Sequence, residues 1–180
     1  LDIEGTNVKS FYETITDIAS GEYHKEILSA EELIQETIKY SHAFVGDTKL
    51  NLYNLRCEYS TRLLQRLIIN IVTNSRKAQD NSLDVRFFLK PNLVTTNNEE
   101  FFELMIDDDG PGLPESILKN GWGKEKSRWG GSGIGMANHA RIIKEQFGGQ
   151  LIPARVVDNE GYVYRGARVI LQLPIIKGNP

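Results

Sequence analysis

The sequence predicts an α/β fold, a two-layer α/β sandwich in which a mixed, mostly antiparallel sheet carries its helices on one face. Two observations predict it. Apolar residues recur at helical spacing in several segments, and short apolar runs bounded by turn residues lie between those segments. Because 180 residues is near the size of one domain, we expect the two kinds of element to pack as layers around one core.

The expected helices have both periodicity and end signals. Residues 7–20 carry an apolar stripe, and Gly21 follows as a stop signal. Ser29 and Glu32 form a capping pattern for a helix that should run to about Phe44. Ser60 or Thr61 can cap the next one. The remaining helices are expected from there to 79, at 114–119 and at 136–147.

Strands are expected where apolar residues alternate or cluster between turn residues. The polar stretch 91–100 predicts a loop or hairpin tip, and 158–161 predicts a turn. We divide the chain into an N-terminal helical segment, residues 1–25, and a catalytic domain, residues 26–180. The expected strands are 50–55, 83–89, 101–106, 150–157 and 167–173.

The composition is that of an ordinary globular domain, with 40% hydrophobic residues, 25% charged residues and a formal net charge of −3. This balance argues against a nucleic-acid partner, which usually requires a basic stripe. Cys57 is the single cysteine, so we expect a buried thiol and a reducing, cytoplasmic compartment. No run reaches the ~18 apolar residues of a membrane helix. The chain begins at Leu1, which we interpret as a piece of a longer protein whose membrane anchoring stays open.

Asn70, Asn74 and Lys77 form the first segment that can carry chemistry. At roughly 100° per residue they fall within about 60° of one another on their helix, beside its apolar stripe. Amide oxygens suit a hard cation such as Mg²⁺, and a lysine one turn on can reach a phosphate. Alone, the segment is more typical of a solvated helix flank.

Asp108 ends the second segment, the run from Ile106 to Leu113. Strand alternation places it on the same face as Phe102, Leu104 and Ile106, at the end of a buried row. A carboxylate there needs a donor, and the exocyclic amine of a purine is suitable. The nearby Gly110 and Gly112 allow the backbone to approach a flat ring. An acidic turn is the plain alternative, while the spacing does not fit an EF-hand calcium loop.

The third segment is the glycine-rich run 130–136, which opens onto a helix. Glycines at 131, 133 and 135 free backbone N–H groups to face an anion, and the helix N-terminus favours negative charge. It is not a P-loop, because no Gly-Lys-Ser/Thr follows, and it lacks the dinucleotide fingerprint because Met136 holds the last glycine position. Alone, it is also typical of a flexible linker.

In this order and spacing, the three segments resemble the GHKL ATPase superfamily shared by DNA gyrase, a heat-shock chaperone, the MutL repair protein and histidine kinases. The similarity is greatest to the catalytic domain of sensor histidine kinases and covers about residues 28–174. It implies the ATP-binding fold of that superfamily, with ATP and Mg²⁺ as cofactors. The stretch between the second and third segments corresponds to the family's ATP lid, which includes Lys124, Lys126 and Arg128.

The resemblance also assigns roles to residues. Asn74 takes the main Mg²⁺ position and Asn70 a second one, and with Lys77 they form the catalytic set. Asp108 matches the aspartate that bonds the adenine amine. The residues assigned to the nucleotide are Asn74, Lys77, Asp108, Gly110, Gly112, Leu113, Lys124, Gly131, Ser132, Gly133, Ile134, Gly135 and Met136.

A histidine kinase of this kind transfers the γ-phosphate of ATP to a histidine. His24, His42 and His139 each lack the acidic neighbour typical of a phosphoacceptor, so we expect the acceptor on a helical hairpin of the same parent protein, outside this chain. Residues 1–20 are either the tail of that hairpin or an ordinary packing helix. The resemblance further implies a response regulator as partner and a homodimeric full-length protein.

The chain departs from the family in three places. The usual Gly-Thr before the last strand is Gly166-Ala167, which removes a hydroxyl near the adenine. Trp122 or Trp129 stands for the lid Phe, unless it belongs to the core. Asn70 stands where ATP-hydrolysing relatives carry a Glu base, which favours a kinase. The rival functions are a conformational ATPase, a degenerate nucleotide-binding adaptor and a serine kinase of the same superfamily.

Overall fold

A computed structural model describes residues 22–123, 134–157 and 160–177 as two layers, a sheet and a set of helices. The five-stranded sheet has the order β2-β4-β5-β7-β6; β2 runs parallel to β4 and the other pairs are antiparallel. The predicted fold class is confirmed. The strands of this sheet are β2 (Phe44–Val45), β4 (Phe87–Thr96), β5 (Glu99–Asp108), β6 (Gln150–Val157) and β7 (Val163–Pro174).

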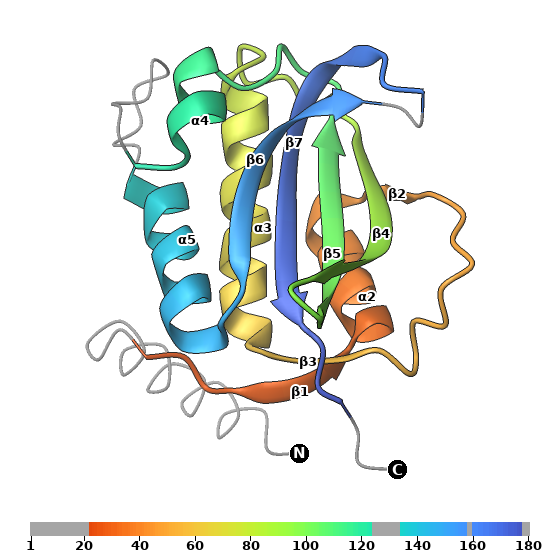
Figure 1. The fold of residues 1–180 in the computed structure, drawn as a ribbon. Coiled ribbons are helices and arrows are strands. Elements are labelled where there is room, and N and C mark those ends of the chain that lie inside the picture. Colours follow the sequence, from red (N-terminus) through yellow and green to blue (C-terminus); the bar gives the residue numbers. More distant parts are fainter. Residues whose placement is uncertain (1–21, 124–133, 158–159, 178–180) are drawn as a thin grey trace, which may run out of the picture.

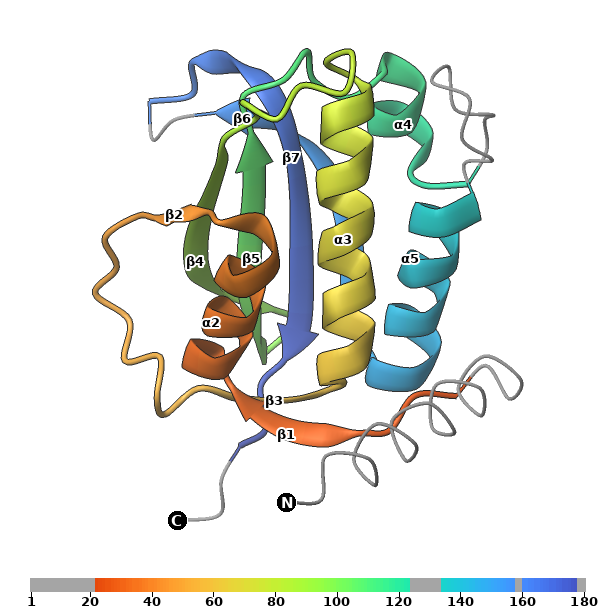
Figure 2. The same ribbon diagram turned by 180° about the vertical axis from the view of Figure 1, so that it is seen from behind.

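The helices lie on one face of this sheet, where α2, α3 and α5 stand in front of the strands in Figure 2. Helix α2 begins with the predicted capping box, in which Ser29 and Glu32 satisfy each other's backbone N–H groups. Helix α3 begins at the predicted cap Ser60, whose hydroxyl accepts from the Leu63 N–H. The helices are α2 (Ala30–Ser41), α3 (Thr61–Lys77), α4 (Glu115–Asn120) and α5 (Ile134–Phe147).

The core lies between the two layers. Helix α3 buries the predicted stripe, and β5 buries alternate side chains against it, as the period of two requires. The side chains that meet in this core include Leu64, Leu67, Ile68 and Ile71 from α3 and Phe102, Leu104 and Ile106 from β5.

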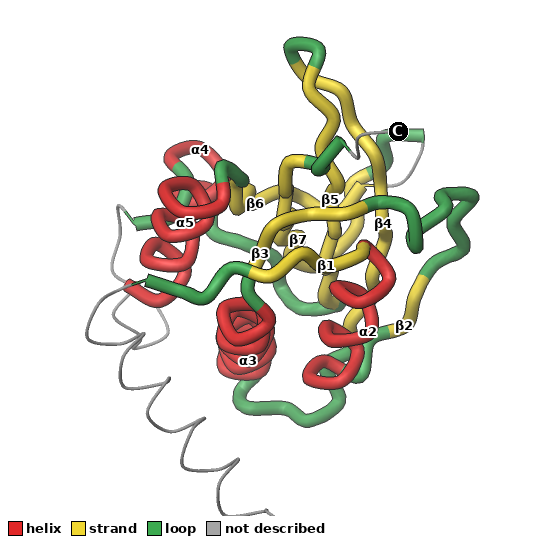
Figure 3. Tube along the Cα trace, turned by 90° about the horizontal axis from the view of Figure 1, so that it is seen from below, coloured by secondary structure: helices red, strands yellow, loops and turns green. Residues whose placement is uncertain are grey.

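A second, two-stranded antiparallel sheet pairs β1 (Glu26–Ser29) with β3 (Arg56–Tyr59). Seen from below, it crosses the end of the molecule between the helices and the main sheet (Figure 3). Cys57 and Ile175 form an isolated antiparallel β-bridge, and the Ile176 N–H donates to the Arg56 carbonyl. The small sheet is therefore hydrogen-bonded to the residues that follow β7. Neither β1 nor β3 is among the predicted strands.

Several predicted boundaries are wrong. Residues 50–55 form turns, in which the Asn54 N–H donates to the Asn51 carbonyl, although Leu52 and Leu55 still pack on the core. The spacing of leucines that predicted a strand here is therefore explained by leucines of a turn that are partly buried against the core. The strand predicted from residue 83 begins at Phe87, because Leu83 is 78% exposed and lies before the sheet. Helix α2 ends at Ser41, short of the predicted Phe44, because the capping residue His42 has a left-handed conformation.

The stretch 91–100, predicted as a loop or hairpin tip, does contain a hairpin tip, but most of its residues belong to strands. Strand β4 continues through Thr96, and β5 begins at Glu99. Between them Asn97 and Asn98 both have positive φ, 52° and 64°, which is the geometry of a two-residue type I′ hairpin turn. Likewise β7 begins at Val163, four residues before the predicted strand. The sheet thus extends farther than the apolar pattern, because cross-strand pairing continues beyond the buried rows.

The helix predicted at 7–20 lies outside the described residues, and the domain boundary near residue 25 stays a prediction. In the part of the chain that is described, no helix combines the length and the apolar character needed to cross a membrane.

Candidate functional site

Asp108 is a buried carboxylate at the end of β5. Its side chain follows the buried row of Phe102, Leu104 and Ile106 and is only 7% exposed, so the predicted position is confirmed. Three donors reach it. The N–H groups of Gly110 and Ala167 donate to Oδ1 at 2.8 and 3.0 Å, and the Ser75 hydroxyl donates to Oδ2 at 2.5 Å. The carboxylate is therefore held from the loop, from β7 and from α3 at once.

Ser75 is a site residue that the sequence reasoning missed. It lies four residues after Ile71, within the apolar stripe of α3, and it is buried. A polar residue at a core position needs a hydrogen-bond partner, so a serine inside the stripe was a usable signal. Nothing in the sequence indicated which partner it finds, because Asp108 is 33 residues away along the chain.

The three consecutive aspartates take three different partners. Asp107 points to the opposite face of the sheet and accepts two hydrogen bonds of 2.7 Å from Arg168, an arrangement that raises the pKa of Arg168. Asp109 accepts from the backbone N–H and Nε of Arg86 at 3.1 and 2.8 Å. Burial raises the pKa of Asp109, but its interactions with Arg86 outweigh burial, so that pKa lies below its ordinary value.

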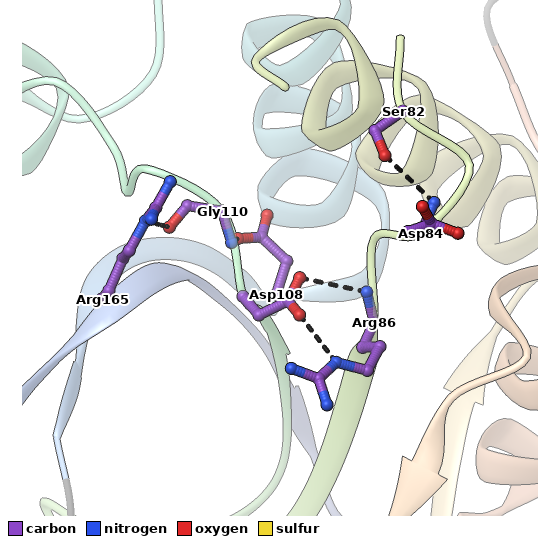
Figure 4. Close-up of polar contacts among 7 residues, drawn as sticks. Ser82, Asp84, Arg86, Asp108, Gly110 and Arg165 are labelled. Carbon is purple, nitrogen blue, oxygen red and sulfur yellow. Dashed lines mark hydrogen bonds and ion pairs between the residues drawn. The ribbon is translucent and has the colours of Figure 1, made fainter. Parts of the chain in front are cut away.

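These contacts hold the loop after β5 in place. Figure 4 shows Arg165 and Arg86 on opposite sides of this loop, with Asp108 and Gly110 between them. The Arg165 Nε donates to the Gly110 carbonyl at 3.2 Å. With Asp107 and Asp109 each turned to an arginine, Asp108 is the member of the triplet that faces the helices.

Three glycines, Gly110, Gly112 and Gly166, stand around Asp108 at positions where a side chain would collide with neighbouring atoms. A Cβ on Gly110 would lie 2.9 Å from the Gln79 Nε2 and 3.0 Å from the Asp108 Oδ1. Gly166 has a φ of 134°, and a Cβ there would overlap the Asp108 carbonyl oxygen. Gly112 has a φ of 92° and faces the Gly166 carbonyl. That Gly110 and Gly112 let the backbone approach a flat ring stays a prediction.

The two asparagines of α3 lie beside the start of α5. The Asn74 Nδ2 donates to the Asn70 Oδ1 at 3.2 Å, so the predicted pairing on one helix face is confirmed. A Cβ on Gly135 would lie 2.6 Å from the Asn70 Nδ2, which means that Gly135 packs directly on the Asn70 amide. Lys77 is exposed at the last residue of α3.

In the described geometry α3 carries the pair of amides and contacts both the buried acceptor Asp108, through Ser75, and Gly135 at the start of α5, through Asn70. Residues 59–177 match the family described as histidine kinase-, DNA gyrase B-, and HSP90-like ATPase. The chain belongs to this family. The predicted resemblance to an ATP-binding domain of the histidine-kinase type is therefore confirmed.

Known relatives of this ATPase family agree with the match. A putative sensor histidine kinase, NtrY-like, from Rickettsia prowazekii (strain Madrid E) is 22% identical over 129 residues, 69% of this chain. This chain spans about 19% of that relative's length.

Solved structures show the same fold. The catalytic domain of histidine kinase ThkA, in a nucleotide-free form, has a TM-score of 0.59 at 18% identity over 84% of this chain and 97% of its own. The mycobacterial sensor histidine kinase MprB gives 0.56 at 18% identity, over 84% and 98%. Full-length ShkA in complex with AMPPNP gives 0.57 at 14% identity, over 88% and 33%.

The ATP-binding domain buries His139 one turn after Gly135. The Gly135 carbonyl accepts a hydrogen bond from the His139 Nδ1 at 2.9 Å, and Nε2 is buried without a partner among the described residues. Burial lowers the pKa of His139, because the charged form would lose its hydration. A neutral ring is therefore favoured, and it holds the Gly135 carbonyl at the start of α5.

The other predicted nucleotide residues fall into three groups. Met136 is buried in the core, and Ile134 is the first residue of α5. Leu113 is half-buried and lines a small pocket of about 80 Å³ between the loop after β5 and the strands β6 and β7. Lys124, Gly131, Ser132 and Gly133 lie outside the described residues, together with Lys126, Arg128 and Trp129.

Of the two tryptophans considered for the lid, Trp122 is described. It packs partly buried against the core, and its Nε1 donates to the Leu151 carbonyl at 2.9 Å. Trp122 therefore has the core role that was the alternative to a lid role.

Proposed function

We propose that this chain is the catalytic domain of a sensor histidine kinase, which binds Mg-ATP and transfers its γ-phosphate to a histidine outside the chain. The observation that supports it best is the Asp108 carboxylate, which is buried, held by three donors and still able to accept a fourth hydrogen bond. The adenine amine of ATP is a donor of the right kind. Gly110 and Gly112 are proposed to shape the adenine pocket, because a glycine lets the backbone approach a flat base closely.

Asn70 and Asn74 are proposed to hold Mg²⁺. Because the Asn74 amide donates its Nδ2 to Asn70, its own Oδ1 stays available as an oxygen ligand. The described residues contain no group of three His, Cys, Asp or Glu side chains suited to a metal. The proposal therefore rests on the two amides, since Mg²⁺ uses few protein ligands and completes its shell with water and substrate phosphates. When bound, it would neutralise charge on the phosphates.

The chain's own residues would orient the nucleotide. Asp108 anchors the base at one end of α3's inner face, and the amide pair lies beside the start of α5, where backbone N–H groups favour an anion. Lys77 and lid Lys124 are proposed to approach the phosphates, together with Gly131, Ser132 and Gly133. Asn70 cannot remove a proton from water, so the described site favours transfer to a protein over hydrolysis.

The phosphoacceptor is proposed to lie on a helical hairpin of the same parent protein. His139 is buried, which removes it from attack on a bound nucleotide, whereas His24 and His42 are exposed but lack an acidic neighbour. A response regulator as the next acceptor, a homodimeric parent and a cytoplasmic location remain part of the proposal. Residues 1–25 are proposed to be an N-terminal helical segment that forms the tail of that hairpin.

Binding of Mg-ADP tests the proposal directly. Asp108→Asn should weaken it by about a hundredfold, because an amide replaces one acceptor oxygen and disturbs three hydrogen bonds. Asp84→Asn is the matched control, since Asp84 is exposed on the loop near Ser82 (Figure 4). Equal affinities in the two variants would remove Asp108 from the base pocket.

Phosphate transfer needs the parent protein. Radiolabelled ATP should label a histidine in it, giving a product that acid hydrolyses but base does not. An acid-stable product would favour the serine kinase, and steady phosphate release without any labelled protein would favour the ATPase. Mg-ADP binding without either would favour the adaptor.

A further inference from the structure

Ser75 joins the helical layer to the base-binding carboxylate. Its hydroxyl donates to the Asp108 Oδ2 at 2.5 Å, a short bond, and the side chain is only 8% exposed. The other two donors are backbone N–H groups that the loop and β7 supply whatever their side chains. Ser75 is therefore the one side-chain donor among the hydrogen bonds described for this carboxylate.

The three donors are unevenly shared between the two oxygens. Gly110 and Ala167 both donate to Oδ1, whereas Ser75 donates to Oδ2. A carboxylate has about two acceptor positions on each oxygen. Oδ1 is thus saturated, and Oδ2 keeps one position, whose direction depends on the bond from Ser75.

We infer that Ser75 is a positioning residue that aims the remaining lone pair of the Asp108 Oδ2 at the exocyclic amine of the base and so sets the preference for adenine. This inference rests on the proposed function. A base with a carbonyl at the same ring position would place acceptor against acceptor, and two unpaired acceptors in a buried site repel and lose hydration. Ser75 contributes to this selection without touching the base itself.

A purely structural role for Ser75 makes a different prediction. If the hydroxyl only provides a hydrogen bond to a buried carboxylate, its removal loosens the pocket and weakens the binding of all nucleotides equally. If it aims the Oδ2 lone pair, its removal weakens the binding only of nucleotides whose base carries an amine that donates to Oδ2. The two roles are separated by comparing ADP with IDP, in which a carbonyl replaces the amine.

The experiment measures displacement of a fluorescent ADP analogue by ADP and by IDP from the full 180-residue chain, with Mg²⁺ present. Ser75→Ala should lower the affinity for ADP by about fivefold to tenfold, which is the effect of one lost hydrogen bond. It should change the affinity for IDP by less than about twofold. Ser41→Ala is the matched control, because its buried hydroxyl donates to the Thr37 carbonyl in α2. It should leave both affinities unchanged.

Each outcome decides one point. Equal weakening of ADP and IDP by Ser75→Ala, or no weakening of either, would overturn the positioning role and leave the proposed function intact. Failure of the wild-type chain to bind either nucleotide would overturn the proposed function as well. Should Ser75→Ala not fold, Ser75→Cys offers a weaker donor of similar size, and the same selective loss for ADP is expected.

Discussion

Replacing Gly135 by alanine should separate nucleotide binding from stability. A Cβ at this position would lie 2.6 Å from the Asn70 Nδ2, whereas ordinary contacts begin near 3.4 Å, so the amide must shift by about 0.8 Å. Gly135 is in the first turn of α5, and its φ is not in the left-handed region. The methyl group therefore acts on Asn70 and leaves the backbone of α5 unstrained.

The free energy of unfolding should change little. Alanine favours a helix interior over glycine by up to about 1 kcal/mol. Against this, the shift costs the exposed hydrogen bond of 3.2 Å between Asn74 and Asn70, about 0.5–1 kcal/mol. The two effects nearly cancel, and urea unfolding followed by circular dichroism should place Gly135→Ala within about 1 kcal/mol of the wild type.

Binding of Mg-ATP should respond much more strongly. Moving one amide oxygen by most of an ångström removes it from a metal shell whose geometry Mg²⁺ holds tightly. We expect affinity for Mg-ATP, measured by calorimetry, to fall at least about tenfold, while metal-free ATP in EDTA loses less. Gly46→Ala is the matched control, because its added methyl would meet only the Leu89 carbonyl, at 3.6 Å.

An unchanged Mg-ATP affinity in a folded Gly135→Ala protein would refute this reasoning. It would mean that the Asn70 amide does not contribute to the metal site. Equal losses with and without Mg²⁺ would instead assign the glycine to the nucleotide alone.

Three further outcomes are expected. Burial lowers the pKa of His139, so below about pH 6.5 the unfolded chain binds a proton that the folded chain does not bind. The free energy of unfolding, measured by denaturant titration, should therefore fall between about pH 8 and 5.5, and it should fall less in His139→Asn. The control variant His24→Gln, at an exposed position, should behave as the wild type. Gly166→Ala should destabilise by roughly 2–4 kcal/mol, because its φ is 134° and its methyl would overlap the Asp108 carbonyl; a melting temperature near wild type would contradict this. Burial raises the pKa of Cys57 to about 12, so a thiol reagent should label it at pH 8 only as fast as the chain unfolds.

Strand and helix periodicity predicted the site's main supports. The period of two along β5 placed Asp108 at the end of a buried row, and the period of 3.6 along α3 placed Asn70 and Asn74 together. Both predictions depend on neighbours within one element, whose geometry is repeated and local. Turns were predicted less well, because Asn97-Asn98 reverses the chain in two residues within a stretch whose polarity resembles a longer loop.

The sequence by itself determined the family and indicated which residues to propose as ATP contacts, since the order of amide, aspartate and glycine segments requires no knowledge of their distances. Only the tertiary structure decided that Ser75 holds the Asp108 carboxylate and that Gly135 packs on Asn70. These pairs come from segments 33 and 65 residues apart, brought together by the packing of α3 on the sheet and on α5. Hydrophobic burial drives that packing without direction, so the polar partners it brings together follow from the complete fold.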